Sequence, residues 1–200
     1  LVATNMTASS ITSLLSSETA RRNAIESLKA AVLGFGDGVN VDMEGVPAAQ
    51  KANLVTFVAD LAAAFHAAIP GSHVSLCPPA VDWSGAFDYD ALAAACDGLF
   101  IMAYDYHWRS GSQAGPVSPL AGGGVWGTYN VTWTVNDYLT WGGSANRSKL
   151  ILGLPFYGYE WPTASTGVPS PTTGAGISMT YDVARVNAAA HGRLWDGASL

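Results

Sequence analysis

The residues best suited to chemistry lie in one short run, 37–44, which reads DGVNVDME. Side chains alternate between the two faces of a strand, so Asn40, Asp42 and Glu44 share one face and the apolar residues between them share the other. Two carboxylates and an amide on the buried face of a sheet are costly for structure alone. The structural alternative is an edge strand with a solvated polar face, but parallel strands between helices are normally apolar on both faces. We therefore expect a reactive site at the carboxyl end of this strand.

The paired carboxylates Asp42 and Glu44 suit acid–base chemistry. Neighbouring carboxylates in a site of low polarity do not both ionise easily, so one is expected to stay protonated near neutral pH and to act as a general acid. Glu44 is the outermost residue and the best placed to reach a substrate. Asp42, one pleat below, would share the proton, and Asn40 would hold Asp42 by a hydrogen bond without adding a third charge.

The elements that must position this run alternate between apolar strands and amphipathic helices, a pattern typical of βαβ units and a parallel sheet. The pattern predicts five strands: 1–4, 38–44, 73–77, 99–105 and 150–154. It predicts five helices: 18–33, 47–69, 89–96, 132–141 and 181–190. The segment 107–129 is rich in Gly and Trp, and the last forty residues are predicted to be loop apart from their short helix. No repeat or linker divides the chain, which indicates one domain or part of one.

Composition excludes several classes of partner. With 49% hydrophobic and 12% charged residues the chain is neither disordered nor a coiled coil. A net charge of −6 lacks the basic surface that binds nucleic acid, and the apolar runs are far shorter than the ~20 residues of a membrane span. Neither nucleic acid nor a membrane is an expected partner. The four histidines lack metal-ligand spacing, so neither a metal nor another cofactor is expected.

The two cysteines are predicted to be free, buried thiols. Cys77 ends one predicted strand and Cys96 precedes another, so the two lie near opposite ends of their strands. A strand of about five residues spans ~17 Å, which far exceeds the ~6 Å between the Cα atoms of a disulfide.

The run DGVNVDME resembles the DxxDxDxE signature of the family-18 glycoside hydrolases, the chitinase-like (β/α)8 barrels, with Asn40 where the family usually has its middle Asp. Three further stretches agree in order and spacing: FIMAYD at 100–105 resembles strand six, LILGLPFYGY at 150–159 resembles strand seven, and 1–5 with the following helix resembles strand three. The resemblance implies an α/β fold, a (β/α)8 TIM barrel that is incomplete, with approximately strands three to seven present and 1–200 a partial catalytic domain. The chain starts without Met, so we expect a processed or truncated N-terminus, with strands one and two before Leu1 and strand eight after Leu200.

The resemblance also implies a reaction, retaining hydrolysis of β-1,4 bonds beside N-acetylglucosamine, in which the substrate's own acetamido oxygen replaces the nucleophile. By position, Glu44 would protonate the leaving oxygen, Asp42 would orient the acetamido N–H, and Tyr104 would hydrogen-bond the acetamido oxygen. Asp37 would support the start of the strand. Five residues would bind substrate: Asn40, Met102, Asp105, Trp108 and Tyr157.

Aromatic residues just beyond predicted strands are candidates for stacking on sugar rings. Trp83, Trp108 and Trp161 occupy such positions, but packing under long loops explains each of them equally well. Trp133 and Trp141 lie on or beside a helix, where packing is the better interpretation.

The leading hypothesis is a chitinase, endo- or exo-acting, whose partner is chitin or an oligosaccharide containing N-acetylglucosamine and which acts outside the cell. Peptidoglycan and N-glycan cores remain alternative substrates, since their cleavage can use the same acetamido group. The alternative from another class is a non-catalytic, chitin-oligosaccharide-binding member, from which Glu44 would be expected to be missing. A sheet with two open edges predicts self-association of the isolated piece.

Overall fold

The computed structural model describes residues 6–141 and 144–199, so the predicted strand at 1–4 lies outside the described residues. Contacts divide the chain into two compact units: Leu1–Met102 with Asp137–Leu152, and Ala103–Asn136 with Gly153–Leu200. The sequence gives no sign of this division because its boundaries fall within a helix and at the end of a strand rather than in linkers.

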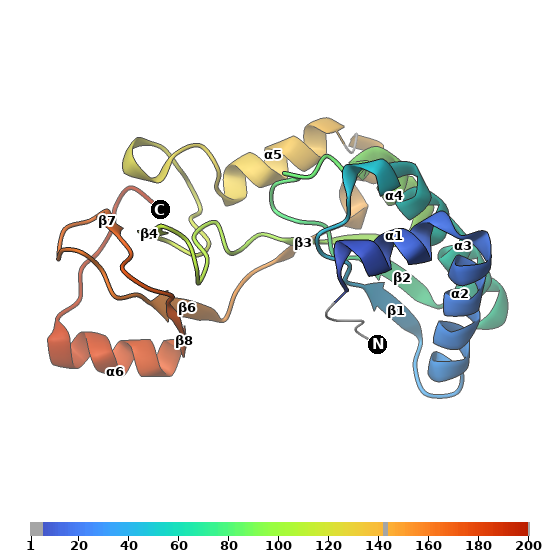
Figure 1. Ribbon diagram of the computed structural model, residues 1–200, viewed down its shortest axis with the longest axis horizontal. Coiled ribbons are helices and arrows are strands. Elements are labelled where there is room, and N and C mark those ends of the chain that lie inside the picture. Colours follow the sequence, from blue (N-terminus) through green and yellow to red (C-terminus); the bar gives the residue numbers. More distant parts are fainter. Residues whose placement is uncertain (1–5, 142–143, 200) are drawn as a thin grey trace. The chain divides into compact units, whose positions relative to one another are not determined.

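The first unit is built on a sheet with the strand order β1-β2-β3-β5 (Figure 1). Its strands are β1 Gly38–Val41, β2 His73–Leu76, β3 Gly98–Met102 and β5 Leu150–Gly153. The pairs β1–β2 and β2–β3 are parallel, with Asn40 beside Ser75 and Val41 beside Leu76. Four of the five predicted strands are confirmed. The first of these was predicted to continue to Glu44, but the chain leaves the sheet after Val41 and turns at Gly45, whose φ of 69° favours glycine.

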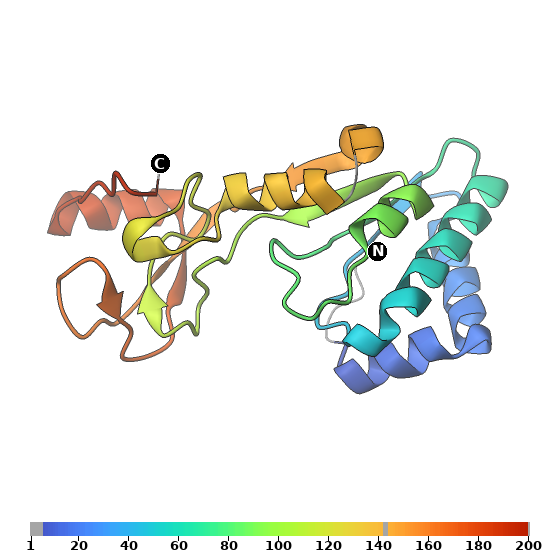
Figure 2. The same ribbon diagram turned by 90° about the horizontal axis from the view of Figure 1, so that it is seen from above.

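The helices of the first unit confirm the predicted amphipathic segments and add one more, α1. They are α1 Ala8–Ser16, α2 Glu18–Val32, α3 Lys51–Ala68 and α4 Tyr89–Ala95, with 3₁₀ turns η1 Ala48–Gln50 and η3 Ser144–Lys149 and, continuing into the second unit, α5 Val131–Trp141. Ser17 caps α2 as expected, since its hydroxyl accepts the Ala20 amide. Helix α2 packs beside β1, α3 beside β2 and α4 beside β3, and Figure 2 shows them on one side of the sheet.

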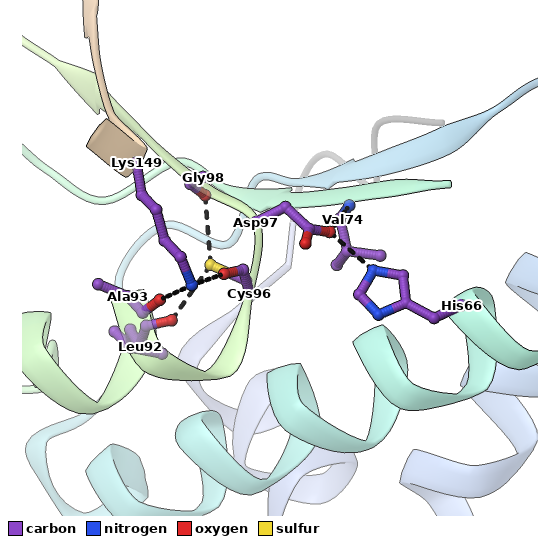
Figure 3. Close-up of polar contacts among 8 residues, drawn as sticks. All are labelled: His66, Val74, Leu92, Ala93, Cys96, Asp97, Gly98 and Lys149. Atoms are coloured by element: carbon purple, nitrogen blue, oxygen red, sulfur yellow. Dashed lines mark hydrogen bonds and ion pairs between the residues drawn. The ribbon is translucent and has the colours of Figure 1, made fainter. Parts of the chain in front are cut away.

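Polar contacts fasten the amino-terminal ends of the strands (Figure 3). The Asp97 carboxylate accepts the Val74 amide at 2.7 Å and lies 2.9 Å from His66 Nε2. The Lys149 ammonium donates to two carbonyls near the end of α4, each at 2.7 Å: Ala93 and Cys96. These bonds fix the strands at one end, whereas Asp42 and Glu44 follow the other end of β1.

The second unit contains two small antiparallel sheets and a helix. Its elements are β4 Gln113–Ala114, η2 Gly124–Trp126, β6 Tyr157–Glu160, β7 Ser170–Pro171, β8 Ile177–Thr180 and α6 Tyr181–His191. The predicted helix at 181–190 is confirmed. The pairs β4–β7 and β6–β8 were not predicted, because β4 and β7 have only two residues each and the four-residue strands β6 and β8 contain no buried residue. Within 6–141 and 144–199, every helix is too short or too polar to cross a membrane.

Candidate active site

The alternation predicted for β1 and the residues after it is confirmed. The apolar side chains are buried, with 5 to 8% exposed: Val39, Val41 and Met43. Asn40 and Asp42 are half-buried and Glu44 is exposed. Gly38 permits this arrangement, because a Cβ at that position would overlap the backbone of His73 on β2. The Asp37 side chain is exposed, and it is the Asp37 carbonyl that accepts the His73 amide, at 2.9 Å.

Asn40 does not hold Asp42 as the sequence predicted. The Asn40 amide oxygen accepts a hydrogen bond from the Cys77 thiol at 2.9 Å. Asp42 Oδ1 is buried and has no hydrogen-bond partner among the described residues. The sequence prediction failed because it considered one strand alone. Cys77 directly follows β2 on the face that Asn40 and Asp42 occupy, and its thiol lies within hydrogen-bond distance of the Asn40 amide oxygen.

Both cysteines are free and buried, as predicted. Burial raises the pKa of Cys77 to about 11, and the negative charges of Asp42 and Glu44 add to this effect against the opposing hydrogen bond with Asn40. The Cys77 thiol therefore keeps its proton near neutral pH and acts as a donor.

A pocket of about 210 Å³ opens beside Glu44 within the first unit. Glu44 and Met102 both line it, so the structure brings together the predicted acid and one predicted substrate contact. Trp83 lines the same pocket and is 75% exposed. The sequence left a sugar contact and packing as equal alternatives for Trp83, and this exposed position on the pocket favours the sugar contact.

The loop that carries Trp83 is held in shape by a residue that sequence reasoning missed, Asp82. Its carboxylate accepts the Ser84 hydroxyl at 2.8 Å and the amides of Ala86 and Phe87 at 3.3 and 2.8 Å. The spacing Asp-Trp-Ser is a local signal for such a turn, because short polar side chains bond to nearby backbone amides.

A second missed residue, Tyr138, fixes the start of this loop. Its buried hydroxyl donates to the Pro79 carbonyl at 2.7 Å, and its ring stacks on Tyr89 at 3.8 Å. Burial raises the pKa of Tyr138, so the phenol remains a donor. No local pattern could reveal a bond between positions so far apart in the sequence.

In the second unit, Asp105 is the centre of another cluster. Its φ of 58° is left-handed, and its carboxylate accepts the Tyr157 hydroxyl at 2.9 Å and the Tyr159 hydroxyl at 3.2 Å. The Tyr104 ring meets the Tyr157 ring edge-on at 6.2 Å. Burial, then the hydrogen bond and charge of Asp105, raise the pKa of Tyr157 and keep its hydroxyl protonated. Three predicted site residues thus meet, and sequence reasoning missed Tyr159.

The remaining tryptophans occupy varied surroundings. Trp108 is 54% exposed. The Trp161 indole donates to the Arg109 carbonyl at 3.2 Å, which favours packing. Trp133 meets the Tyr129 ring edge-on, as a packing residue does, whereas Trp141 is exposed. Among residues 6–141 and 144–199, no cluster of three or more His, Cys, Asp or Glu side chains could hold a metal ion.

Similarity to solved structures first defines the class of fold. The catalytic domain 2 of the Group II chitinase of Ostrinia furnacalis superposes with a TM-score of 0.72 at 27% identity, over 82% of this chain and 46% of that one. A Trichuris suis chitinase superposes over the whole chain and 61% of its own, with a TM-score of 0.88 at 21% identity. The predicted α/β fold, an incomplete TIM barrel of the chitinase type, is confirmed.

The family follows from the sequence comparison. The model of glycosyl hydrolases family 18 matches residues 4–197, and the chain belongs to this family. Human di-N-acetylchitobiase is 28% identical over 201 aligned positions, which cover 86% of this chain and 48% of the relative. Mouse chitotriosidase-1 is 34% identical over 74% of this chain and 35% of its own length. The chain therefore spans between about a third and a half of these curated relatives.

Proposed function

We propose that the chain carries the acid–base machinery of a chitinase-like glycosidase, which hydrolyses β-1,4 bonds beside N-acetylglucosamine with retention. One observation carries the proposal: Glu44 is exposed on a pocket, and Asp42, two residues earlier on the same face, has a buried oxygen without a partner among the described residues. A buried acceptor of this kind is costly until a donor arrives. The acetamido N–H of the substrate is a donor of the right chemistry.

The reaction balances with these groups. The acetamido oxygen attacks the anomeric carbon while the glycosidic C–O bond breaks, and the proton of Glu44 passes to the leaving oxygen. Asp42 accepts the acetamido N–H and stabilises the positive charge of the cyclic intermediate. The Glu44 carboxylate then takes a proton from water, whose oxygen replaces the acetamido oxygen at the anomeric carbon. Two inversions leave the original configuration.

For the cluster around Asp105 we propose the substrate-binding roles implied by the resemblance. Tyr104 hydrogen-bonds the acetamido oxygen, and Asp105, Tyr157 and Trp108 contact the sugars. The two phenols that donate to Asp105 support this role, because they hold its carboxylate in one orientation. Asn40 keeps the substrate-binding role implied by the resemblance, with its NH2 group as the donor, because the Cys77 thiol donates to its amide oxygen.

Trp83 extends the proposal to the sugar on the far side of the bond that is cleaved. Glu44 must reach the leaving oxygen, and Trp83 presents an exposed ring on the wall of the same pocket. Aromatic rings provide a large apolar surface at low entropic cost. The partner is a chito-oligosaccharide or chitin; a variant of the similar Ostrinia furnacalis chitinase domain is known in complex with penta-N-acetylchitooctaose.

Chitin is a polymer, and an enzyme that degrades it is expected to act outside the cell.

The test compares the wild-type chain with Glu44→Gln on a chromogenic chitobioside. The amide keeps the shape of the side chain but cannot supply the proton, so kcat should fall by about 100- to 10,000-fold. Equal rates in the two proteins would falsify the assignment. Binding of chito-oligosaccharide without hydrolysis by either protein would favour the non-catalytic alternative. Peptidoglycan fragments and N-glycan cores, assayed beside the chitobioside, decide among the substrates.

A further inference from the structure

Cys77 lies beside the two residues of β1 that the proposed mechanism depends on. The last register pair of β1 and β2 is Val41 with Leu76, and the Cys77 amide donates to the Val41 carbonyl at 2.8 Å. Cys77 is therefore level with Asp42, and side chains at the same level of neighbouring parallel strands share a face. Asn40 lies one pleat below on that face.

The Cys77 thiol has one proton to donate, and two acceptors lie within its surroundings. The structure gives that proton to the Asn40 amide oxygen at 2.9 Å and leaves Asp42 Oδ1 without a partner among the described residues. An amide has its oxygen on one side and its NH2 group on the other, so a donor beside the oxygen favours the orientation in which the NH2 group points away from that donor. The bond from Cys77 therefore holds the Asn40 oxygen toward the thiol, and the amide, which does not titrate, cannot share a proton with Asp42.

We propose that Cys77 is a positioning residue, whose thiol holds the Asn40 amide in one of its two orientations and so keeps Asp42 Oδ1 open for the acetamido N–H of the substrate. This inference rests on the proposed function of Asp42. Without the thiol the Asn40 amide would be able to flip. Its oxygen would then face Asp42, repel the Asp42 carboxylate and compete with it for the acetamido N–H of the substrate. The effect is on orientation, since the buried thiol does not touch the reacting atoms.

The test uses Cys77→Ala, which removes the donor, and Cys77→Ser, which restores one. The side-chain NH2 signals of Asn40 in a ¹⁵N–¹H correlation spectrum report the state of the amide directly. We expect these signals to shift in Cys77→Ala and to return toward the wild-type positions in Cys77→Ser. On the chromogenic chitobioside, kcat/KM should fall about threefold to tenfold in Cys77→Ala, as expected for one hydrogen bond, and recover in Cys77→Ser.

Cys96 provides the matched control. It is also buried, but its thiol donates to the backbone carbonyls of Leu92 and Gly98, at the opposite ends of the strands (Figure 3). Cys96→Ala therefore removes a buried thiol and should leave both the Asn40 signals and kcat/KM as in the wild type. If Cys77→Ala does not fold, Cys77→Val, which fills the space without a donor, gives the same readout.

Unchanged Asn40 signals in the donor-free variants would overturn the proposal, as would a loss of kcat/KM that Cys77→Ser does not recover. The spectrum needs no substrate, so it also separates the two proposals. If Glu44→Gln hydrolyses as fast as the wild type, the proposed function fails, and the Asn40 signals still decide whether the thiol orients the amide.

Discussion

Replacing Asp82 with Ala should weaken the fold and the binding of sugar together. The carboxylate holds the Phe87 amide and the Ser84 hydroxyl at 2.8 Å, whereas the Ala86 amide at 3.3 Å contributes less. Two good hydrogen bonds at about 1 kcal/mol each give a loss near 2 kcal/mol. For a chain of this length, Tm should fall by about 4 to 8 °C.

The same substitution releases the loop that presents Trp83. Because that ring is proposed to bind sugar and not to react, KM for a chito-oligosaccharide should rise several-fold while kcat stays close to that of the wild type. The assays are thermal unfolding and steady-state kinetics. Asp82→Asn, which keeps one acceptor oxygen, should lie between the two proteins, and Trp83→Ala should raise KM without lowering Tm. An unchanged Tm for Asp82→Ala, or a fall in kcat at constant KM, would refute the reasoning.

Two further predictions concern the scaffold. Gly38→Ala should lower the free energy of unfolding in urea by about 3 kcal/mol, since the added Cβ meets the backbone of β2. Gly158→Ala, where a Cβ meets open space, should have little effect. Equal losses of unfolding free energy in the two variants would contradict this. Burial opposes the charge of Asp97, but hydrogen bonds from Val74 and His66 outweigh it and lower the pKa of Asp97. The stabilisation from the Asp97 carboxylate is therefore complete above its unfolded-state pKa of about 3.9 and is lost as pH falls through its folded-state pKa. The wild type should accordingly lose its Tm advantage over Asp97→Asn in acid. A Tm difference between the two proteins that does not depend on pH would exclude this explanation.

The parts of the fold that were predictable are those with a buried face. Strands β1 to β3 and helices α2 to α4 bury apolar side chains, so their periodicity is visible in the sequence. Strand β5 is the exception, since its apolar run was recognised although Ile151 and Leu152 are exposed. Strands β6 and β8 contain no buried residue, and each is only four residues long. The tyrosines of β6 do alternate with Gly158 and Glu160, but both tyrosines bond to Asp105, so they do not mark an apolar face. Helix α1 was missed although Thr7 caps it and although it buries two residues, as α2 does, because its nine residues are too few to show a helical period.

The candidate site shows the same division between local and non-local information. The two-residue period of 38–44 was sufficient to place Asp42 and Glu44 on one face, and the burial pattern confirms it. The partner of Asn40 depends on the register between β1 and β2, which no single strand encodes. Tyr138 and Tyr159 likewise act through bonds to Pro79 and Asp105, over 50 residues away.

The amide at position 40 and the thiol at position 77 are best understood together. An aspartate at position 40 would add a third carboxylate to a face that already carries Asp42 and Glu44, and its charge would be repelled by both. An asparagine removes that repulsion but introduces an ambiguity, because its oxygen and its NH2 group have nearly the same shape and opposite hydrogen-bonding roles. A protonated donor beside the amide resolves the ambiguity, and Cys77, kept neutral by its burial and by the same carboxylates, is such a donor.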